Sequence, residues 1–370
     1  RQDVYERAKE ALRNKAVELG YMDAAFTIHT ITISIEQSAA EIDIVLETGP
    51  QYLFGDVTFI GIAPYPLQFL KRHLEFKTGE VFSYEKIART QANLVNTDRF
   101  KEAIVKPKKE EAVDYRIPVE VQVLPSPTKR LKLGVGYATD TGPRGTLYYQ
   151  DFNFIRSGHS ITAELTASET LQGIGVKYVL PGTSDIDSLT SLKVVAQRED
   201  TQSYTTNLLS IEAERMRSFG PGRIGSLFVQ MQKEHSEAGG QHTSSFLLLP
   251  GARFSERRFD NLVRPNKGFN YQMELRGTHQ ALGSETGFAQ FLGHGELLIP
   301  LPNRFSILTR MQAGSTWQNE PAKNLPVTFR FFAGGDKSVR GYKYQGLGPK
   351  DQTGQVVGGK HLIVGIIEVE

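Results

Sequence analysis

The chain has 370 residues and a mass of 41.2 kDa, which predicts two or more domains. Hydrophobic residues make up 39%, mean hydropathy is −0.32, and no apolar run approaches the roughly 20 residues that a spanning helix needs, which excludes a helical membrane protein but not a membrane β-barrel. The formal charge of +2 is spread along the chain without a basic tract for nucleic acid, and the absence of cysteine excludes disulfides and thiolate metal sites.

The N-terminal stretch has the pattern of one helix followed by two strands. Apolar residues recur at helical spacing between Val4 and Leu19, and Gly20 ends the helix. Alternating residues then predict strands at 26–35 and 41–47. We interpret residues 1–49 as the C-terminal part of a small α+β domain, because the leading elements of the next domain have no counterpart here.

Residues 50–124 repeat this pattern with two additional elements at the front. The expected order is strand, helix, helix, strand, strand, and Ser83 is a typical N-cap for the second helix. Two unrelated α+β segments are the alternative. The expected elements lie at 52–61, 66–76, 83–97, 102–106 and 115–124.

Residues 125–129 form a stiff linker, since Pro125 and Pro127 each restrict the backbone, and helical spacing ends there. Residues 130–370 instead alternate with a period of two, as in Ser160 to Ser168. Their length favours membrane strands, although a soluble double sheet also alternates. Twelve strands are predicted at 130–140, 145–156, 159–169, 172–180, 188–201, 203–218, 222–235, 242–257, 268–280, 286–299, 303–316 and 360–370.

The polar faces of these strands suit a wet lumen and the apolar faces suit lipid. If the first strand leaves the soluble domains on the periplasmic side, the odd-numbered connections lie outside the cell. The polar set includes Glu164, Glu212, Glu214, Glu274, Arg276, Glu296 and Arg310.

The eleventh connection, from Gln318 to about Gly359, is the longest. It contains Phe331-Phe332-Ala333-Gly334-Gly335-Asp336 and Val339-Arg340-Gly341-Tyr342. Glycines permit tight turns, aromatics can pack on a barrel wall, and the Arg340 guanidinium can bind a carboxylate with two hydrogen bonds. An exposed loop with a solvated arginine is the alternative interpretation.

These residues resemble the signature loop of the POTRA-barrel superfamily, which includes BamA, TamA and the two-partner-secretion transporters. Residues 50–124 resemble a POTRA domain, including Gly49-Pro50-Gln51-Tyr52 and Phe54-Gly55-Asp56-Val57. Tyr342-Lys343-Tyr344 is most similar to the TamA type.

The resemblance implies a transmembrane antiparallel β-barrel of about sixteen strands preceded by α+β POTRA domains. About twelve strands are present, so we expect a chain cut within a domain before Val4 and within the barrel after Glu370. It also implies a signature loop made of Gly334, Gly335, Asp336, Val339, Arg340, Gly341 and Tyr342.

The loop is expected to fold into the lumen, where Arg340 pairs with Glu368. The first strand is expected to form a lateral gate, with small residues on its inner face that weaken its packing. The gate residues are Leu131, Leu133, Gly134, Val135, Gly136 and Tyr137.

No enzyme is expected, because the sequence lacks His-Glu-x-x-His, Gly-x-Ser-x-Gly and P-loop patterns. His294 and Glu296 share a strand face, and we interpret them as a polar lumen pair rather than a catalytic dyad. Gly134-x-Gly136 lacks the helix of a dinucleotide site. No cofactor and no metal are predicted.

The resemblance implies a factor of the bacterial outer membrane, with periplasmic POTRA domains, that inserts or secretes outer-membrane proteins such as autotransporters by strand pairing at a barrel seam. Its expected partners are outer-membrane lipid, client proteins and a periplasm-spanning TamB-like protein, with one barrel per functional unit. The alternatives are a BamA-like insertase, a two-partner-secretion exporter and a passive porin.

Overall fold

A computed structural model describes residues 2–34, 39–61, 64–138, 141–182, 186, 188–238, 240–261, 264–302, 305–319, 321, 324–336 and 338–369. Contacts divide the chain into two compact units. The first comprises Arg1–Thr128 with Ile155–Gly158, and the second comprises Lys129–Phe154 with His159–Glu370. Within the described residues, no helix combines the length and apolar character needed to cross a membrane.

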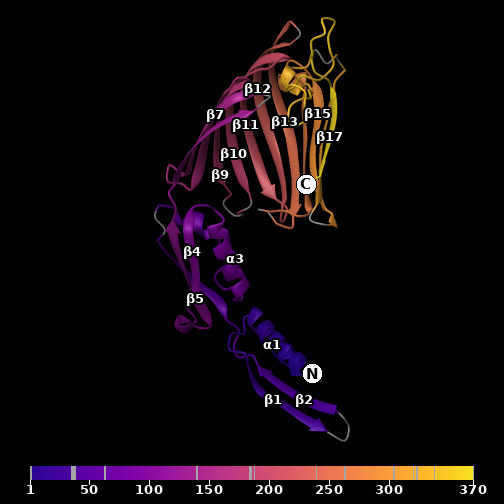
Figure 1. Cartoon of the computed structure of the whole chain (residues 1–370). Helices are drawn as coiled ribbons and strands as arrows, with labels where there is room; N and C mark the ends of the chain where they lie inside the picture. The colour runs from indigo at the N-terminus through magenta and orange to yellow at the C-terminus, as the bar shows by residue number, and fades with distance from the viewer. Residues whose placement is uncertain are drawn as a thin grey trace. The chain divides into compact units, whose positions relative to one another are not determined.

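The first unit begins with helix α1 (Gln2–Glu18), which is followed by strands β1 (Ala25–Ser34) and β2 (Ala39–Glu47). The two strands pair with each other as an antiparallel hairpin (Figure 1). Gly20 adopts φ +86° at the end of the helix, a conformation that favours glycine. This is the helix and two strands that the sequence predicts.

The rest of the first unit is a small α+β fold around a three-stranded sheet of order β3-β5-β4. Strand β3 is parallel to β5, whereas β4 is antiparallel to it. Phe54, Leu94 and Ile117 are fully buried in one core that joins the sheet to the helices. The elements are β3 (Leu53–Ile60), α2 (Leu67–Lys71), α3 (Tyr84–Val95), β4 (Phe100–Pro107), the short η1 (Lys109–Glu111) and β5 (Arg116–Pro125).

Helix α2 ends at Lys71 and is therefore shorter than the helix that the sequence predicts at 66–76. The remaining residues turn inward, so that the Phe76 ring stacks on Phe54 with centroids 3.8 Å apart. The Glu75 backbone N–H donates to Thr90 Oγ1 at 3.0 Å, outside any helical ladder. Tertiary packing therefore overrides the local helical preference here.

The second unit contains one antiparallel sheet of twelve strands in sequence order, in which every interior strand pairs with its neighbours in the chain (Figure 1). The strands are β6 (Lys129–Ala138), β7 (Gly142–Phe154), β8 (His159–Ser168), β9 (Leu171–Pro181), β10 (Leu189–Asp200), β11 (Tyr204–Ser218), β12 (Arg223–Ala238), β13 (Gln241–Phe259), β14 (Gly268–Thr278), β15 (Phe288–Pro300), β16 (Ser306–Trp317) and β17 (His361–Val369).

All twelve predicted strands are present, with bounds that differ by a few residues. The predicted strand ends at 35, 139–140, 303–304 and 370 lie outside the described residues. The sheet has two ends, since β6 pairs only with β7 and β17 only with β16 among the described residues. The sequence thus predicts the membrane-type sheet, and the described strands do not close it into a ring.

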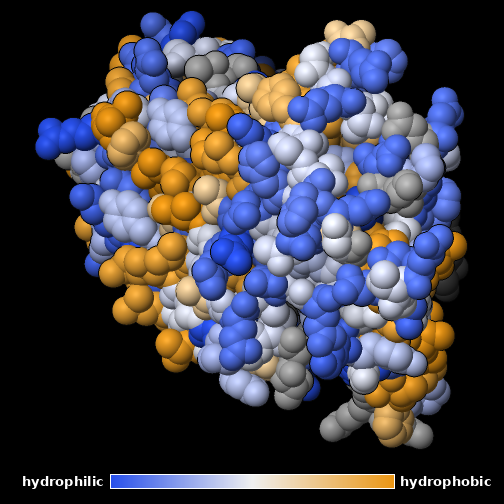
Figure 2. Space-filling view, turned by 90° about the horizontal axis from the view of Figure 1, so that it is seen from above, coloured by the Kyte–Doolittle hydropathy of each residue, from blue (hydrophilic) through white to orange (hydrophobic). Residues whose placement is uncertain are grey.

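Alternation divides the sheet into an inner and an outer face. On β11 the even-numbered residues such as Ser210 and Glu214 are buried, while Leu209 and Ile211 on the odd side are exposed. Register extends this division to the other strands, and it places every polar residue predicted for the lumen on the inner face. Figure 2 shows hydrophilic side chains over the centre of the end-on view and hydrophobic ones along its left and lower right sides.

Candidate functional site

The candidate site is the connection between β16 and β17 together with the inner wall on which it packs. Its first part, here called the loop root, comprises residues 324–330 and contains the short η5 helix (Val327–Phe329). Leu325, Val327 and Phe329 are each at most 2% exposed. The root is therefore a buried part of the second unit rather than a solvent loop.

Apolar inner-wall residues of two strands pack against the loop root. Leu325 and Phe329 pack with Leu247 and Leu249 of β13 and with Phe288 of β15. The Phe288 and Phe329 rings lie 4.9 Å apart. A dry patch of this kind on an otherwise polar wall positions the root by burying its apolar side chains.

Polar contacts fix the same segment in register. The Thr328 hydroxyl donates to the carboxylate of Glu234, and Gln232 Nε2 donates to Thr328 Oγ1 at 2.8 Å. Glu234 is fully buried on β12, and donation from Thr328 and from Gln232 Nε2, at 3.0 Å, replaces the water that its carboxylate loses. On the other side, Gln290 Nε2 donates to the Phe329 carbonyl at 2.9 Å.

Arg330 ties the two halves of the connection together. Its Nε donates to the Leu325 carbonyl at 2.8 Å and its Nη1 to the Val357 carbonyl at 3.1 Å. Two further backbone bonds join Phe331 and Gly359. The connection therefore leaves and returns at one place on the wall.

The predicted signature residues form the loop tip, residues 333–347. Gly334 has φ +111°, and a Cβ there would lie 2.2 Å from the Lys343 carbonyl oxygen, so only glycine fits. Gly335 N–H donates to the Tyr342 carbonyl at 3.0 Å, and Ser338 Oγ bonds both the N–H and the C=O of Gly334. The paired glycines thus close a compact turn that presents Arg340.

The tip also contacts the ends of neighbouring strands. Ser203 Oγ donates to the Gln345 carbonyl at 2.8 Å, and the Tyr344 hydroxyl donates to Glu199 at 3.3 Å. A cavity of about 590 Å³ lies between the tip and these strand ends, with Asp336, Tyr342 and Asp200 among its lining residues. Val339 is half-buried, whereas Tyr342 is 56% exposed.

Arg340 and Glu368 are brought together as the resemblance implies. Arg340 Nη2 lies 2.7 Å from Glu368 Oε1, an ion pair whose angles are not those of a hydrogen bond. Arg310 on β16 binds the same carboxylate from the wall. Glu368 thus serves two arginines, and the sequence predicted only one of them as its partner.

The predicted gate residues all lie on β6. Leu131, Leu133, Val135 and Tyr137 are between 63% and 96% exposed. Gly134 and Gly136 stand on the opposite face, where a Cβ on Gly134 would come within 2.5 Å of Thr146 Oγ1 of β7. The strand therefore has an apolar outer face and an inner face that is bare at Gly134 and Gly136.

A second charged group on the inner wall surrounds Arg253. The sequence did not predict that its members lie together. Arg253 of β13 pairs with Glu212 at 2.6 Å, Glu214 at 3.2 Å and Glu274 at 2.7 Å. The Phe228 ring packs against the guanidinium, with its centroid 3.8 Å away. Alternation predicts that these side chains face inward, but their convergence on Arg253 requires the strand register.

Long alternating strands with an apolar outer face, a polar inner wall and a loop bound to that wall define a transmembrane β-barrel protein, here with a soluble α+β unit before the sheet. The Omp85 superfamily domain matches residues 153–370, more than half of the chain. The POTRA family, described as a surface antigen variable number repeat, matches residues 52–123. The chain belongs to the Omp85 superfamily, and its place is the outer membrane with the POTRA part in the periplasm.

The similarity to a curated relative is distant. The chain is 21% identical over 378 residues to the outer membrane protein assembly factor BamA of Nitratidesulfovibrio vulgaris strain Hildenborough, covering 97% of this chain and 46% of the relative. It therefore spans about half the length of that curated relative.

Solved structures share the fold. The crystal structure of BamA from Haemophilus ducreyi lacking POTRA domains 1–3 superimposes with a TM-score of 0.79 at 15% identity, covering 100% of this chain and 76% of that one. CdiB from Acinetobacter baumannii gives 0.57 at 13% identity, with 96% and 66% covered.

Proposed function

We propose that this chain is an outer-membrane factor that assembles or secretes other proteins by lateral opening at β6 and pairing of this strand with a client strand. The observation that carries the proposal is the inner face of β6 at Gly134 and Gly136, where no side chain packs on the neighbouring β7. Backbone groups that such an opening frees within lipid would be intolerable if they stayed unpaired, which favours pairing with a client strand. The bare inner face at Gly134 and Gly136 weakens the packing of this strand against the rest of the sheet.

The chemistry is non-covalent in this proposal, and the chain acts as a scaffold rather than an enzyme. The loop root stays fixed on the inner wall, while the Arg340–Glu368 pair holds the exposed tip to β17. We assign the chain to the TamA type, with autotransporters as clients and a periplasm-spanning TamB-like partner. Tyr342-Lys343-Tyr344 supports that choice.

Photo-crosslinking in living cells tests the seam. A photoreactive residue at Val135 of β6 is expected to capture client strands during assembly, and the same residue at Leu227 of β12, which is equally outward-facing, is expected to capture none. Capture at both positions to the same extent would contradict the proposal.

A BamA-like insertase is the second candidate, favoured by the likeness to a named BamA. A broad loss of outer-membrane proteins after depletion would favour it, whereas a defect confined to autotransporters and co-purification of a TamB-like protein favour the TamA type. Client crosslinks from the inner-wall position Gln272 instead of β6 would indicate an exporter. Large, steady, solute-selective conductance would indicate a porin.

A further inference from the structure

One end of the sheet carries a concentration of basic residues that the proposed function does not use. Residues 215–223 and 256–267 hold seven arginines or lysines and two acids. These segments lie at the C-terminal end of β11, the start of β12 and the end of β13. Because β6 starts directly after the periplasmic unit and successive strands are antiparallel, this is the periplasmic end of the sheet.

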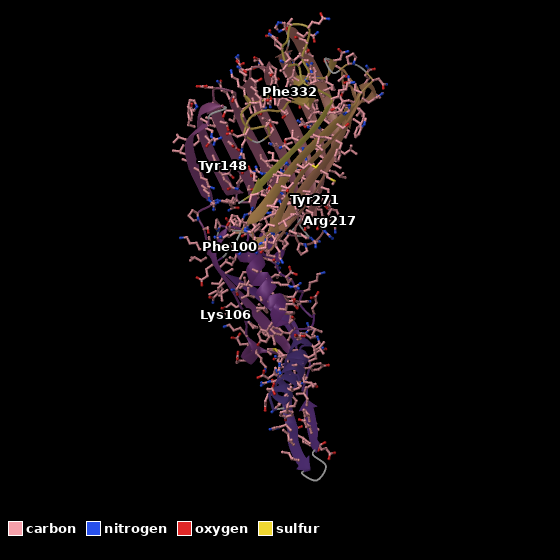
Figure 3. All side chains as sticks on the ribbon, turned by 45° about the vertical axis from the view of Figure 1, so that its right-hand side comes forward. Phe100, Lys106, Tyr148, Arg217, Tyr271 and Phe332 are labelled. Carbon is pink, nitrogen blue, oxygen red and sulfur yellow. The ribbon has the colours of Figure 1, made fainter. Side chains whose placement is uncertain are left out.

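Four of these arginines point outward, and we call three of them the rim cluster: Arg215, Arg223 and Arg258. Arg215 is opposite Leu227 in the register, and Arg223 is opposite Glu256, which places Arg258 on the same face two residues further. All three are exposed. Figure 3 shows the neighbouring Arg217 and Tyr271 at this end of the sheet, away from Phe332.

The surroundings of the rim cluster belong to the lipid-facing surface. Leu227 is 69% exposed beside Arg215, and Phe254 and Met273 continue the outer face toward the middle of the sheet. Tyr271 and Phe269 lie on the outer face of β14 at the height of the arginines. Aromatic residues at this height are typical of the girdle at a membrane interface.

The cluster has more positive charge than its own acid neutralises. Glu256, 9% exposed in its side chain, lies 3.0 Å from Arg223 Nε and 2.5 Å from Arg258 Nε, and it also accepts from the Tyr271 hydroxyl at 2.9 Å. Arg215 donates to the neutral Thr190 Oγ1 at 2.8 Å. One carboxylate therefore pairs with two guanidinium groups, and the third guanidinium donates to a neutral hydroxyl.

We propose that the rim cluster binds the phosphate groups of anionic phospholipids in the inner leaflet of the outer membrane. Guanidinium groups match phosphate oxygens with paired hydrogen bonds, and here they stand at the height of the head groups beside apolar and aromatic side chains. Glu256 holds Arg223 and Arg258 in place and limits the charge. The rim cluster is proposed to bind lipid and not client proteins. A negative result in the lipid test would therefore not contradict the proposed function.

The test measures lipid selectivity of the full chain in nanodiscs made of equal parts phosphatidylglycerol and phosphatidylcholine. Native mass spectrometry of the released protein gives the ratio of the two lipids retained. Arg215→Gln and Arg258→Gln are each expected to lower that ratio about fivefold. Heat-dependent gel mobility confirms that each variant is folded.

Two further variants make the test specific. Arg198→Gln is the matched control, since Arg198 also faces outward but lies near the opposite end of β10, beside Asp200; its ratio should stay at the wild-type value. Glu256→Gln removes the carboxylate that pairs with Arg223 and Arg258 and should raise the ratio. This variant keeps the proposal testable if an arginine variant fails to fold.

The proposal is wrong if folded Arg215→Gln and Arg258→Gln variants retain the wild-type ratio, or if Arg198→Gln lowers it equally. It is also wrong if the ratio is unchanged while capture of a periplasmic protein by these variants is lost, because the surface would then be a protein-binding site.

Discussion

At the scale of single residues, Glu368 is the centre of the contact between loop tip and wall. Arg340 is 65% exposed, so its ion pair is screened by water, whereas Arg310 is only 29% exposed and Glu368 only 19%. The two arginines therefore contribute differently to the binding of Glu368. Arg310 is a fixed part of the wall, whereas the exposed Arg340 can exchange its contact with Glu368 for water.

Arg340→Ala is accordingly expected to change the free energy of unfolding by less than about 1 kcal/mol. Glu368→Gln should cost more, about 2 kcal/mol, because it leaves Arg310 without its carboxylate. Urea titration followed by heat-dependent gel mobility measures both. Lys343→Ala, in the same tip, is the control for a lost charge. If Arg340→Ala alters neither tip proteolysis nor client assembly, the pair has no role in holding the tip or in assembly.

His73 makes the soluble unit sensitive to acid. Burial lowers the pKa of its imidazole to about 4, with Nδ1 2.8 Å from the Phe69 carbonyl. The unfolded chain, with a pKa near 6.5, binds more protons between these values, so stability is complete above pH of about 6.5 and falls toward pH of about 4. The loss should total about 3 kcal/mol.

Helical circular dichroism follows this transition in the whole chain, because the α-helices lie in the first unit. In urea titrations, His73→Leu is expected to remove this part of the pH dependence, and His29→Leu, at an exposed position on β1, should retain it. Equal pH dependence in wild type and His73→Leu would show that another group is responsible.

At the scale of elements, the strands could be predicted and the contacts between distant elements could not. A period of two locates each strand, and neighbours in sequence are neighbours in this sheet. Glu234 and Thr328, in contrast, are 94 residues apart, and no local pattern marks either as the other's partner. Arg340 and Glu368 were predicted only through the resemblance, since the apolar Val364 and Ile366 give the inner face of β17 no local sign of an ion pair.

The loop root offers a test of anchoring. Thr328→Val keeps the shape of the side chain but leaves the buried Glu234 carboxylate without that donor, which should cost about 1–3 kcal/mol. Limited proteolysis within 324–336 should become faster. Thr328→Ser should restore protection, and Glu237→Gln on the exposed side of β12 should have no effect. Unchanged protection in Thr328→Val would assign the anchoring to the apolar contacts alone.

At the scale of the whole molecule, the two faces of the sheet are suited to different solvents. Ile211 on the outer face of β11 is exposed, while the adjacent Ser210 faces a cavity of about 530 Å³ lined by Glu212 and Arg253. Ile211→Arg should therefore destabilise the sheet in a bilayer by about 2–4 kcal/mol. Ser210→Arg should be tolerated better, and the folded fraction in lipid vesicles compares them. Equal folded fractions would mean that the two faces are not divided as described.

The separation of Glu234 from Thr328 also bears on how the molecule folds. Each hairpin of the sheet closes a short stretch of chain, whereas the root contact closes a loop of 94 residues and loses correspondingly more chain entropy. Docking of residues 324–330 is thus expected to be a late kinetic step, taken on a wall that already exists. Until then Glu234 faces water, and the lumen of a newly inserted chain is open before it is occupied.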